Sequence, residues 1–256
     1  MCGIAAISTP RAVSLTAATR MALLALAERG PMAAGYAYAD ASDSEVYVAK
    51  QAGHPRHLQP KIPRSARAVI IHTRWATQGS PSVAANNHPI EWPGCVLVHN
   101  GTIANDAEVF RRLRRPGHRV SRHATVDSEC IAAAIADGQG TLDERLSLPL
   151  GRNACAWLVP GEREIVHAAR VDASPLHLAQ LKNGVALLAS TTRGIDAMAG
   201  ALHSPITYEE SVPEGQYLTL DRGRVTEWRP LALSHRTISL AEARRLRLAK
   251  DQASHG

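Results

Sequence analysis

The chain has 256 residues, 45% hydrophobic and 20% charged, which suits one large domain or two small ones with a sizeable core. No apolar run approaches the roughly 20 residues of a membrane span, and the N-terminus lacks the pattern of a secretory signal. The formal net charge of +6 admits nucleic acid as a partner, but the arginines are scattered and aromatic residues make up only 4%, so we expect neither a nucleic-acid nor a membrane partner.

The first half of the chain alternates between apolar stretches and polar turns. Helical periodicity predicts a helix over 14–28, with Ser14 as its N-cap. Residues 79–94 form a long segment rich in Pro, Asn, Gly and Ser, and long loops inside compact domains are often functional. Strands are predicted at 3–8, 33–39, 45–50, 66–73 and 95–100.

The second half begins with helices at 105–115 and 126–136 and continues as a series of strands. A last helix is predicted over 239–250, where Ser239 and Glu242 form a capping box. The order of elements indicates an α+β fold with antiparallel sheet and no Gly-rich phosphate loop. The strands of the series are predicted at 154–159, 164–169, 175–180, 186–191, 206–211, 215–220 and 224–230.

The four cysteines, Cys2, Cys95, Cys130 and Cys155, are far apart and form no C-x-x-C pair. Without an export signal, this spacing favours a reduced, cytoplasmic protein. It does not favour a zinc site, and we expect no metal and no cofactor.

Cys2 stands directly behind the initiator methionine, in MCGIAAIS. A single cysteine at this position is usually there by chance. The alternative is that Met1 is removed, so that one residue carries a nucleophilic thiol and, in its free α-amine, a base for that thiol. Gly3 would then allow close backbone approach beside it.

Three further stretches carry candidate residues. In HTRWATQG (72–79), Arg74 offers a planar fork to a carboxylate, or else forms a surface salt bridge. In HNGTIAN (99–105), the Asn100 amide and the Gly101 N–H suit an oxyanion hole, although an isolated Asn-Gly pair favours a plain turn. In VDSECI (126–131), Asp127 taken alone is a helix N-cap.

As an ordered set, these stretches resemble one family. MCGI, ERG (28–30), HTRWAT (72–77), NNHP (86–89), HNG (99–101) and DSE (127–129) are similar to the class II glutamine amidotransferases, which are N-terminal-nucleophile (Ntn) hydrolases. The likeness is strongest to the glutaminase domain of glucosamine-6-phosphate synthase and covers roughly residues 2–230. It implies a four-layer αββα sandwich of two antiparallel sheets, with a glutaminase domain over 2–236 and a C-terminal helix and tail over 237–256.

The resemblance also implies a role for each matching residue. Cys2 is the nucleophile after loss of Met1, and it forms a thioester with L-glutamine. Asn100 and Gly101 form the oxyanion hole. The substrate's carboxylate and amine bind Arg74 and Asp127. The remaining matches are Arg29, which holds the catalytic terminus, Trp75 and Thr77 in the loop that closes over glutamine, and His88 near the pocket.

Some positions depart from the family pattern. Gln78 replaces the histidine of WATHG, PMAAG (31–35) replaces YDSAG, and one extra residue lies between Pro81 and the NNHP segment. These changes put loop closure in doubt rather than the core reaction. The chain also ends about where a synthase domain would begin in the family, so we expect ammonia to pass to a separate synthase subunit, with 239–250 as a candidate docking segment.

Other functions remain open at this point. One is an Ntn amidohydrolase that acts alone on another amide, although Arg74 with Asp127 favours an amino-acid head group. Another is a catalytically silent binding subunit, which retention of Met1 would favour. A longer pro-segment before Cys2 is not expected, because only Met1 precedes it.

Overall fold

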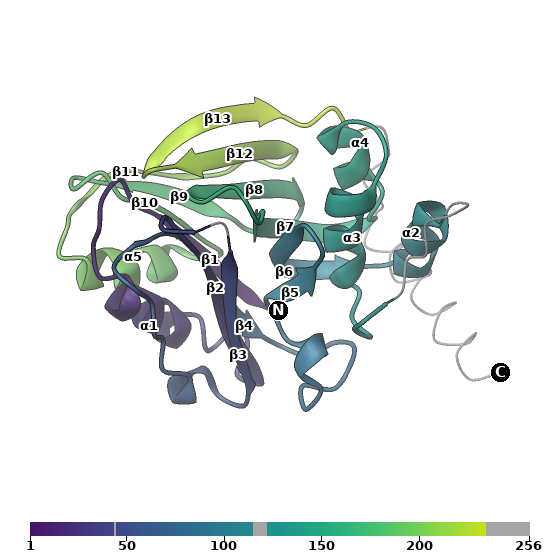
Figure 1. Cartoon of the computed structure of the whole chain (residues 1–256), viewed down its shortest axis with the longest axis horizontal. Helices are drawn as coiled ribbons and strands as arrows, with labels where there is room; N and C mark the ends of the chain where they lie inside the picture. Colours follow the sequence, from purple (N-terminus) through teal and green to yellow (C-terminus); the bar gives the residue numbers. More distant parts are fainter. Residues whose placement is uncertain (44, 115–121, 234–256) are drawn as a thin grey trace.

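The computed structural model describes residues 1–43, 45–114 and 122–233. Within these residues the strands form two antiparallel sheets, one of seven strands and one of six. The sheets lie face to face, and helices cover the outer face of each (Figure 1). The predicted helix over 239–250 lies outside the described residues.

The two sheets contain all the strands predicted from the sequence. The first has the spatial order β11 (Ile206–Ser211), β9 (His177–Leu181), β10 (Ala186–Ala189), β1 (Gly3–Ser8), β4 (Ala66–Arg74), β2 (Ala33–Asp40) and β3 (Val46–Ala52). The second has the order β13 (Arg224–Pro230), β12 (Gln216–Asp221), β8 (Ile165–Asp172), β7 (Gly151–Leu158), β6 (Cys95–Ile103) and β5 (Ile90–Trp92).

The described helices fall into two groups. One group packs on the seven-stranded sheet and consists of α1 (Thr16–Ala25) and α5 (Thr192–Ala201). The other packs on the six-stranded sheet and consists of α2 (Asp106–Leu113), α3 (Glu129–Asp137) and α4 (Leu142–Ser147). Two short 3-10 helices, η1 (Pro55–His57) and η2 (Ala84–Asn86), lie in connections.

The period-2 alternation of the strands sorts their side chains into three apolar layers. On β1, Ile4 packs between the sheets, whereas Ala5 faces the layer of α1 and α5. On β7, Ala156 packs between the sheets, whereas Trp157 faces the layer of α3. The layers are therefore helix, sheet, sheet and helix, and the predicted αββα sandwich is confirmed.

Two local predictions are wrong, and one alternative is excluded. Ser14 does not cap α1, because the N-cap is the fully buried Leu15 and no side chain bonds there, so packing rather than capping sets the helix start. Asn100-Gly101 is not a turn, because β6 runs on through Ile103 and pairs with β7. The segment 79–94 is not all loop, since it contains η2 and β5.

Two helices were not predicted at all. The sequence of α5 carries two glycines, Gly194 and Gly200, which weaken its helical pattern. The six-residue α4 is too short for periodicity to be read, although its capping box of Thr141 and Glu144 is a local signal.

Candidate active site

Cys2 immediately precedes β1, which lies in the middle of the seven-stranded sheet between β10 and β4. Ser190, after β10, holds the start of β1, because its Oγ accepts from the Ile4 N–H at 2.7 Å and donates to the Ile4 carbonyl at 3.0 Å. The Cys2 Sγ lies 3.7 Å from the Trp75 carbonyl oxygen and donates to it. A central strand therefore fixes the position of the thiol.

Close packing explains the glycine that follows Cys2. A Cβ at Gly3 would lie 2.6 Å from Thr73 Oγ1 and 2.8 Å from Leu26 Cβ, closer than real side chains approach. From the same side, the Arg29 Nε donates to the Cys2 carbonyl at 2.9 Å. The backbone at Cys2 is thus clamped between β4 and the segment after α1.

Arg74 ends β4 and is only 3% exposed. Its Nη1 donates to Asn87 Oδ1 at 2.8 Å, and its Nη2 donates to the carbonyls of Gln78 and Gly79 at 2.5 and 2.8 Å. The guanidinium thereby holds the loop that follows β4 against the sheet. Its charge remains uncompensated by an ion pair within the part of the chain that the structure describes.

The asparagines of NNHP brace the same loop. The Asn87 Nδ2 donates to the Pro81 carbonyl at 2.7 Å, and the Asn86 Nδ2 donates to the Ser80 carbonyl at 3.1 Å. The Asn86 Oδ1 accepts from the Thr125 N–H at 2.8 Å, which ties the loop to the segment before α3. The two asparagines therefore fix the conformation of this loop.

Asn100 and Gly101 lie side by side on β6. Asn100 is 1% exposed, and its Nδ2 has no hydrogen-bond partner among the described residues. A buried donor without a partner costs free energy, so its presence next to a thiol points to a ligand oxygen. Gly101 must be glycine, because a Cβ there would lie 1.8 Å from the Arg152 carbonyl oxygen.

Asp127 is buried in the segment before α3, but it is not an N-cap. The N-cap position belongs to Ser128, which makes no side-chain capping bond. Asp127 Oδ2 accepts from the Ile103 N–H at 2.6 Å and Oδ1 from the Ser128 N–H at 3.0 Å. The carboxylate is thus oriented by the end of β6.

Three buried histidines surround these groups. The rings of His72 and His88 stack with centroids 4.0 Å apart, and His99 Nδ1 bonds Ser128 Oγ at 2.8 Å. Burial lowers the pKa of His72 to about 3 and also lowers the pKa values of His88 and His99, so all three rings are neutral at pH 7. Burial raises the pKa of the Cys2 thiol, and the thiol donates its hydrogen bond to the Trp75 carbonyl rather than to a histidine.

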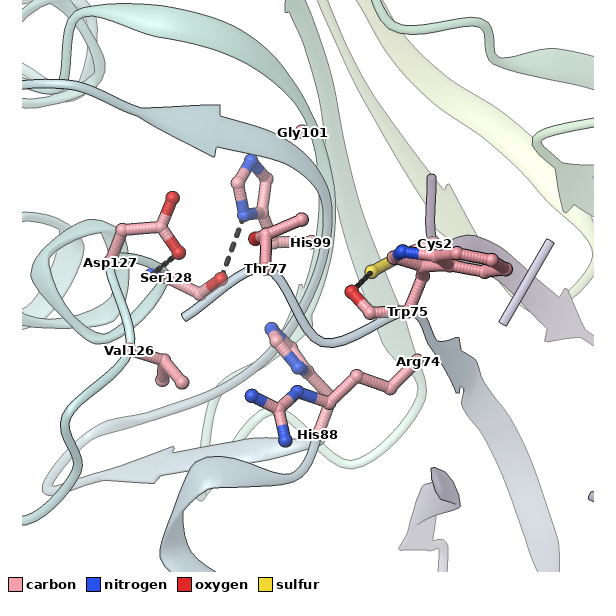
Figure 2. Close-up of a pocket in the computed structure, with 10 residues that line it drawn as sticks. All are labelled: Cys2, Arg74, Trp75, Thr77, His88, His99, Gly101, Val126, Asp127 and Ser128. Carbon is pink, nitrogen blue, oxygen red and sulfur yellow. Dashed lines mark hydrogen bonds between the residues drawn. The ribbon is translucent and has the colours of Figure 1, made fainter. Parts of the chain in front are cut away.

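Two cavities meet at Cys2 and share Trp75, Thr77 and Gly101 as walls. The first, here called the head-group cavity, has a volume of about 20 Å³, room for about one water molecule. Figure 2 shows Asp127 and Ser128 across it from Cys2 and Trp75. Its lining comprises Cys2, Arg74, Trp75, Thr77, His88, His99, Gly101, Val126, Asp127 and Ser128.

The second cavity, here called the Arg152 cavity, is larger, with a volume of about 120 Å³. Its lining comprises Met1, Cys2, Trp75, Thr77, Asn100, Gly101, Thr102, Arg152 and Ser174. The thiol and the unpartnered Asn100 amide therefore face a space that can admit a reacting group.

Comparisons with known proteins agree with this geometry. No family model matches the chain. Glutamine–fructose-6-phosphate aminotransferases of Caulobacter vibrioides and Symbiobacterium thermophilum are 36% and 35% identical to it, over 62% and 76% of this chain and 25% and 33% of their own lengths. An amidophosphoribosyltransferase of Mycobacterium leprae is 29% identical over 89% of this chain and 42% of its own.

This chain is a homologue of the class II glutamine amidotransferases. It spans less than half the length of each of these curated relatives. Among solved structures, the glutamine phosphoribosylpyrophosphate amidotransferase of B. subtilis superposes with a TM-score of 0.68 at 19% identity, over 91% of this chain and 50% of that chain. That likeness supports the fold alone.

The amidotransferase homologue brings the residues predicted from its sequence together. Arg74, Trp75, Thr77, His88 and Asp127 line the head-group cavity with Cys2 and Gly101. Asn100 lines the Arg152 cavity, and Arg29 bonds the Cys2 backbone. The roles implied for these residues stay predictions.

Sequence reasoning missed several lining residues. His99 and Ser128 lie inside motifs that the sequence singled out, HNG and DSE, and their proximity to named candidates is a usable signal. Arg152 and Ser174 carry no local signal, because only the pairing of β6 with β7 and β7 with β8 brings them beside Cys2.

Two features are absent from the described residues. Across 1–43, 45–114 and 122–233, no group of three or more His, Cys, Asp or Glu side chains is arranged to hold a metal ion. Within the same ranges, no helix is long and apolar enough to cross a membrane.

Proposed function

We propose that this amidotransferase homologue hydrolyses L-glutamine to L-glutamate and ammonia through a thioester on Cys2. The observation that carries the proposal is the Cys2 thiol at the junction of the two cavities, with a buried, unpartnered Asn100 amide in the lining of one of them. A thiol and a free oxyanion donor are the two groups that acyl transfer from an amide requires.

The base in this proposal is the α-amine that Cys2 gains when Met1 is removed. The pKa of the Cys2 thiol is raised by burial, so the thiol needs a base before it can attack. Its nearest described partner is a carbonyl oxygen, and the neighbouring histidines are held in other contacts or stacked. The α-amine would lie on the same residue as the thiol.

The proposed reaction has two stages. The amine takes the Sγ proton, Sγ bonds to the side-chain carbonyl carbon of glutamine, and the oxygen becomes negative beside Asn100 Nδ2 and the Gly101 N–H. The C–N bond then breaks, and the amine returns its proton to the departing ammonia. Water next attacks the thioester, the C–S bond breaks, and glutamate leaves with the thiol restored.

Arg74 and Asp127 are proposed to bind the two charges of the glutamine head group. They line one cavity and carry opposite charges, which fixes both the affinity and the orientation of an amino acid. At about 20 Å³, that cavity must enlarge before glutamine enters. We infer that the Arg74 bonds to the Gln78 and Gly79 carbonyls are exchanged for bonds to substrate as the loop shifts.

The fate of the ammonia is a further part of the proposal. Protonated ammonia is no nucleophile, so it must reach its acceptor by a protected route. Two of the curated relatives are named glutamine–fructose-6-phosphate aminotransferases, a name that pairs glutamine with an acceptor. We propose a separate synthase subunit as the consumer. The candidate docking segment 239–250 lies outside the described residues, so no surface is assigned to that subunit.

A direct test is glutamate release from L-glutamine by the purified full chain. The proposal predicts release by the wild type and none by Cys2→Ala. Cys155→Ala is the matched control, because Cys155 is fully buried and burial raises its pKa to about 12. Equal release by wild type and Cys2→Ala would overturn the proposal, as would no release from a chain that has lost Met1.

A further inference from the structure

The Arg152 cavity places a second positive charge near Cys2, in a space that Arg74 does not line. Arg152 Nη2 lies 3.7 Å from the Met1 Sδ, and Arg29 Nη2 lies 3.9 Å from the same sulfur. Two guanidinium groups therefore converge on one weak, uncharged acceptor. This is an unusual arrangement, because a thioether satisfies a cation poorly.

Neither guanidinium has a full counter-charge in the described part of the chain. Arg29 donates from Nε to the Cys2 carbonyl, and Arg152 donates from Nη2 to the Ala173 carbonyl at 3.4 Å. Burial raises the pKa of the Asp172 carboxyl, and the nearby Arg152 charge lowers it by less. The two side chains form no ion pair within the described ranges. Arg152 also lowers the pKa of Arg29, after the larger effect of burial, as expected of like charges held close together.

Removal of Met1 changes this space. The thioether leaves, the cavity of about 120 Å³ gains the volume of the side chain, and both guanidinium groups lose that contact. What remains beside the new Cys2 amine is a pocket lined by Arg152, with Arg29 held next to it at the Cys2 carbonyl. An anion between them would offset their repulsion and bond to both.

The linings of the two cavities indicate which part of a ligand each would meet. Arg74 and Asp127 line only the head-group cavity, Asn100 and Arg152 line only the Arg152 cavity, and Cys2 lines both. A γ-glutamyl group that fills the head-group cavity presents its amide at Cys2. The nitrogen of that amide, and anything attached to it, then extends toward Arg152.

We propose that Arg152, with Arg29, forms a subsite for a carboxylate on the leaving amine, so that the enzyme also accepts γ-glutamyl amino acids in place of glutamine. This rests on the proposed function, since it uses the same thioester. Attack by Sγ forms the S–C bond and breaks the C–N bond, and the amino acid leaves with the proton returned by the Cys2 amine. Water then frees glutamate.

The experiment compares three substrates of the processed full chain. These are L-glutamine, γ-L-glutamylglycine, which carries a carboxylate on the leaving amine, and γ-L-glutamylethylamide, which has a similar length and no charge there. The proposal predicts that kcat/KM for γ-glutamylglycine exceeds that for the ethylamide by about tenfold or more, as expected when charge-assisted hydrogen bonds are made to only one of them.

Arg152→Met tests the residue. Methionine keeps the unbranched stem and removes the charge, so the preference for γ-glutamylglycine over the ethylamide is expected to fall about tenfold. Arg224→Met, an exposed arginine on β13, is the control and should keep the preference. Equal losses on both amides in Arg152→Met would mean that Arg152 only supports the structure, and would overturn the subsite.

The two proposals fail in different ways. A wild type that cleaves glutamine but neither substituted amide, or cleaves both equally, contradicts the subsite and leaves the glutaminase standing. A wild type that cleaves none of the three contradicts the glutaminase. In that case calorimetry of γ-glutamylglycine and the ethylamide with Cys2→Ala decides the subsite, because equal affinities would overturn it and a preference removed by Arg152→Met would support it.

Discussion

Cys2 differs from the other three cysteines in what surrounds it. Cys95, Cys130 and Cys155 are fully buried in the apolar layer where α3 packs on the six-stranded sheet, and burial raises the pKa values of Cys95 and Cys155. Cys2 is half-buried and borders both cavities. Of these four thiols, an electrophile that enters the site meets that of Cys2. We therefore expect it to modify Cys2 selectively.

Asn100→Ala removes a donor that the described residues leave unused. The account predicts a loss of about 10²–10³-fold in kcat for glutamine, with a small change in KM, because the amide would act in the transition state. Initial rates of glutamate release measure this. A change confined to KM would place Asn100 in substrate binding instead.

His72 predicts a pH dependence of stability. Its pKa is about 3 in the folded chain, below the ordinary value near 6.5, because burial opposes the charged form. Between these values the unfolded chain binds a proton that the folded chain does not, so the free energy of unfolding falls as pH falls, by up to about 1.4 kcal/mol per unit from this group. Above pH 6.5 the effect is absent.

Denaturant titrations between pH 7 and 4 test that dependence. His72→Gln can keep a donor toward the His99 carbonyl and removes the titrating ring, so its stability should fall less steeply over the same range. An unchanged slope in the variant would show that His72 does not contribute.

At the scale of elements, the β6–β7 pairing positions the proposed oxyanion donors. Gly101→Ala would set a Cβ against the Arg152 carbonyl of β7, so the pairing must shift, and we expect a loss of about 1–3 kcal/mol of stability together with activity. Gly200→Ala in α5 is the opposite case, because a Cβ there meets nothing within 4 Å. It should stabilise by about 0.5–1 kcal/mol, and thermal unfolding compares the two.

The loop after β4 is the element expected to move when glutamine binds. Trp75, the first residue of this loop, is 48% exposed, whereas Trp92 and Trp157 are buried. Titration of the Cys2→Ala chain with L-glutamine should therefore change the tryptophan fluorescence, and Trp75→Phe in the same background should remove most of that change. D-glutamine is the control ligand. The same change in the absence of Trp75 would contradict loop movement.

Much of this arrangement was open to prediction from sequence. The strands carry long runs of apolar and β-branched residues, which predict strands. The ordered motifs indicate the family, and the family resemblance predicts the sandwich and most of the residues that line the head-group cavity. The start of α1 was missed because burial of Leu15 outweighed the Ser14 cap. Arg152 was missed because only long-range strand pairing brings it to Cys2, and no local pattern encodes that pairing.

At the scale of the whole molecule, three apolar layers hold two sheets so that β1 and β6 deliver Cys2 and Asn100 to one place. Figure 1 shows the N-terminus near β4 and β6, and Met1 is exposed there. The backbone of the next residue, Cys2, is bonded to Arg29. Met1, at the outer side of that end, occupies the space that the proposed chemistry needs.

The most direct test of the central claim is an intact mass spectrum of the purified chain, before and after exposure to 6-diazo-5-oxo-norleucine, a glutamine-like electrophile. The account predicts a mass that lacks one methionine, and a single adduct that Cys2→Ala abolishes. A retained methionine with no adduct would contradict the account, because the amine would then stand on the wrong residue and the thiol would lack its base.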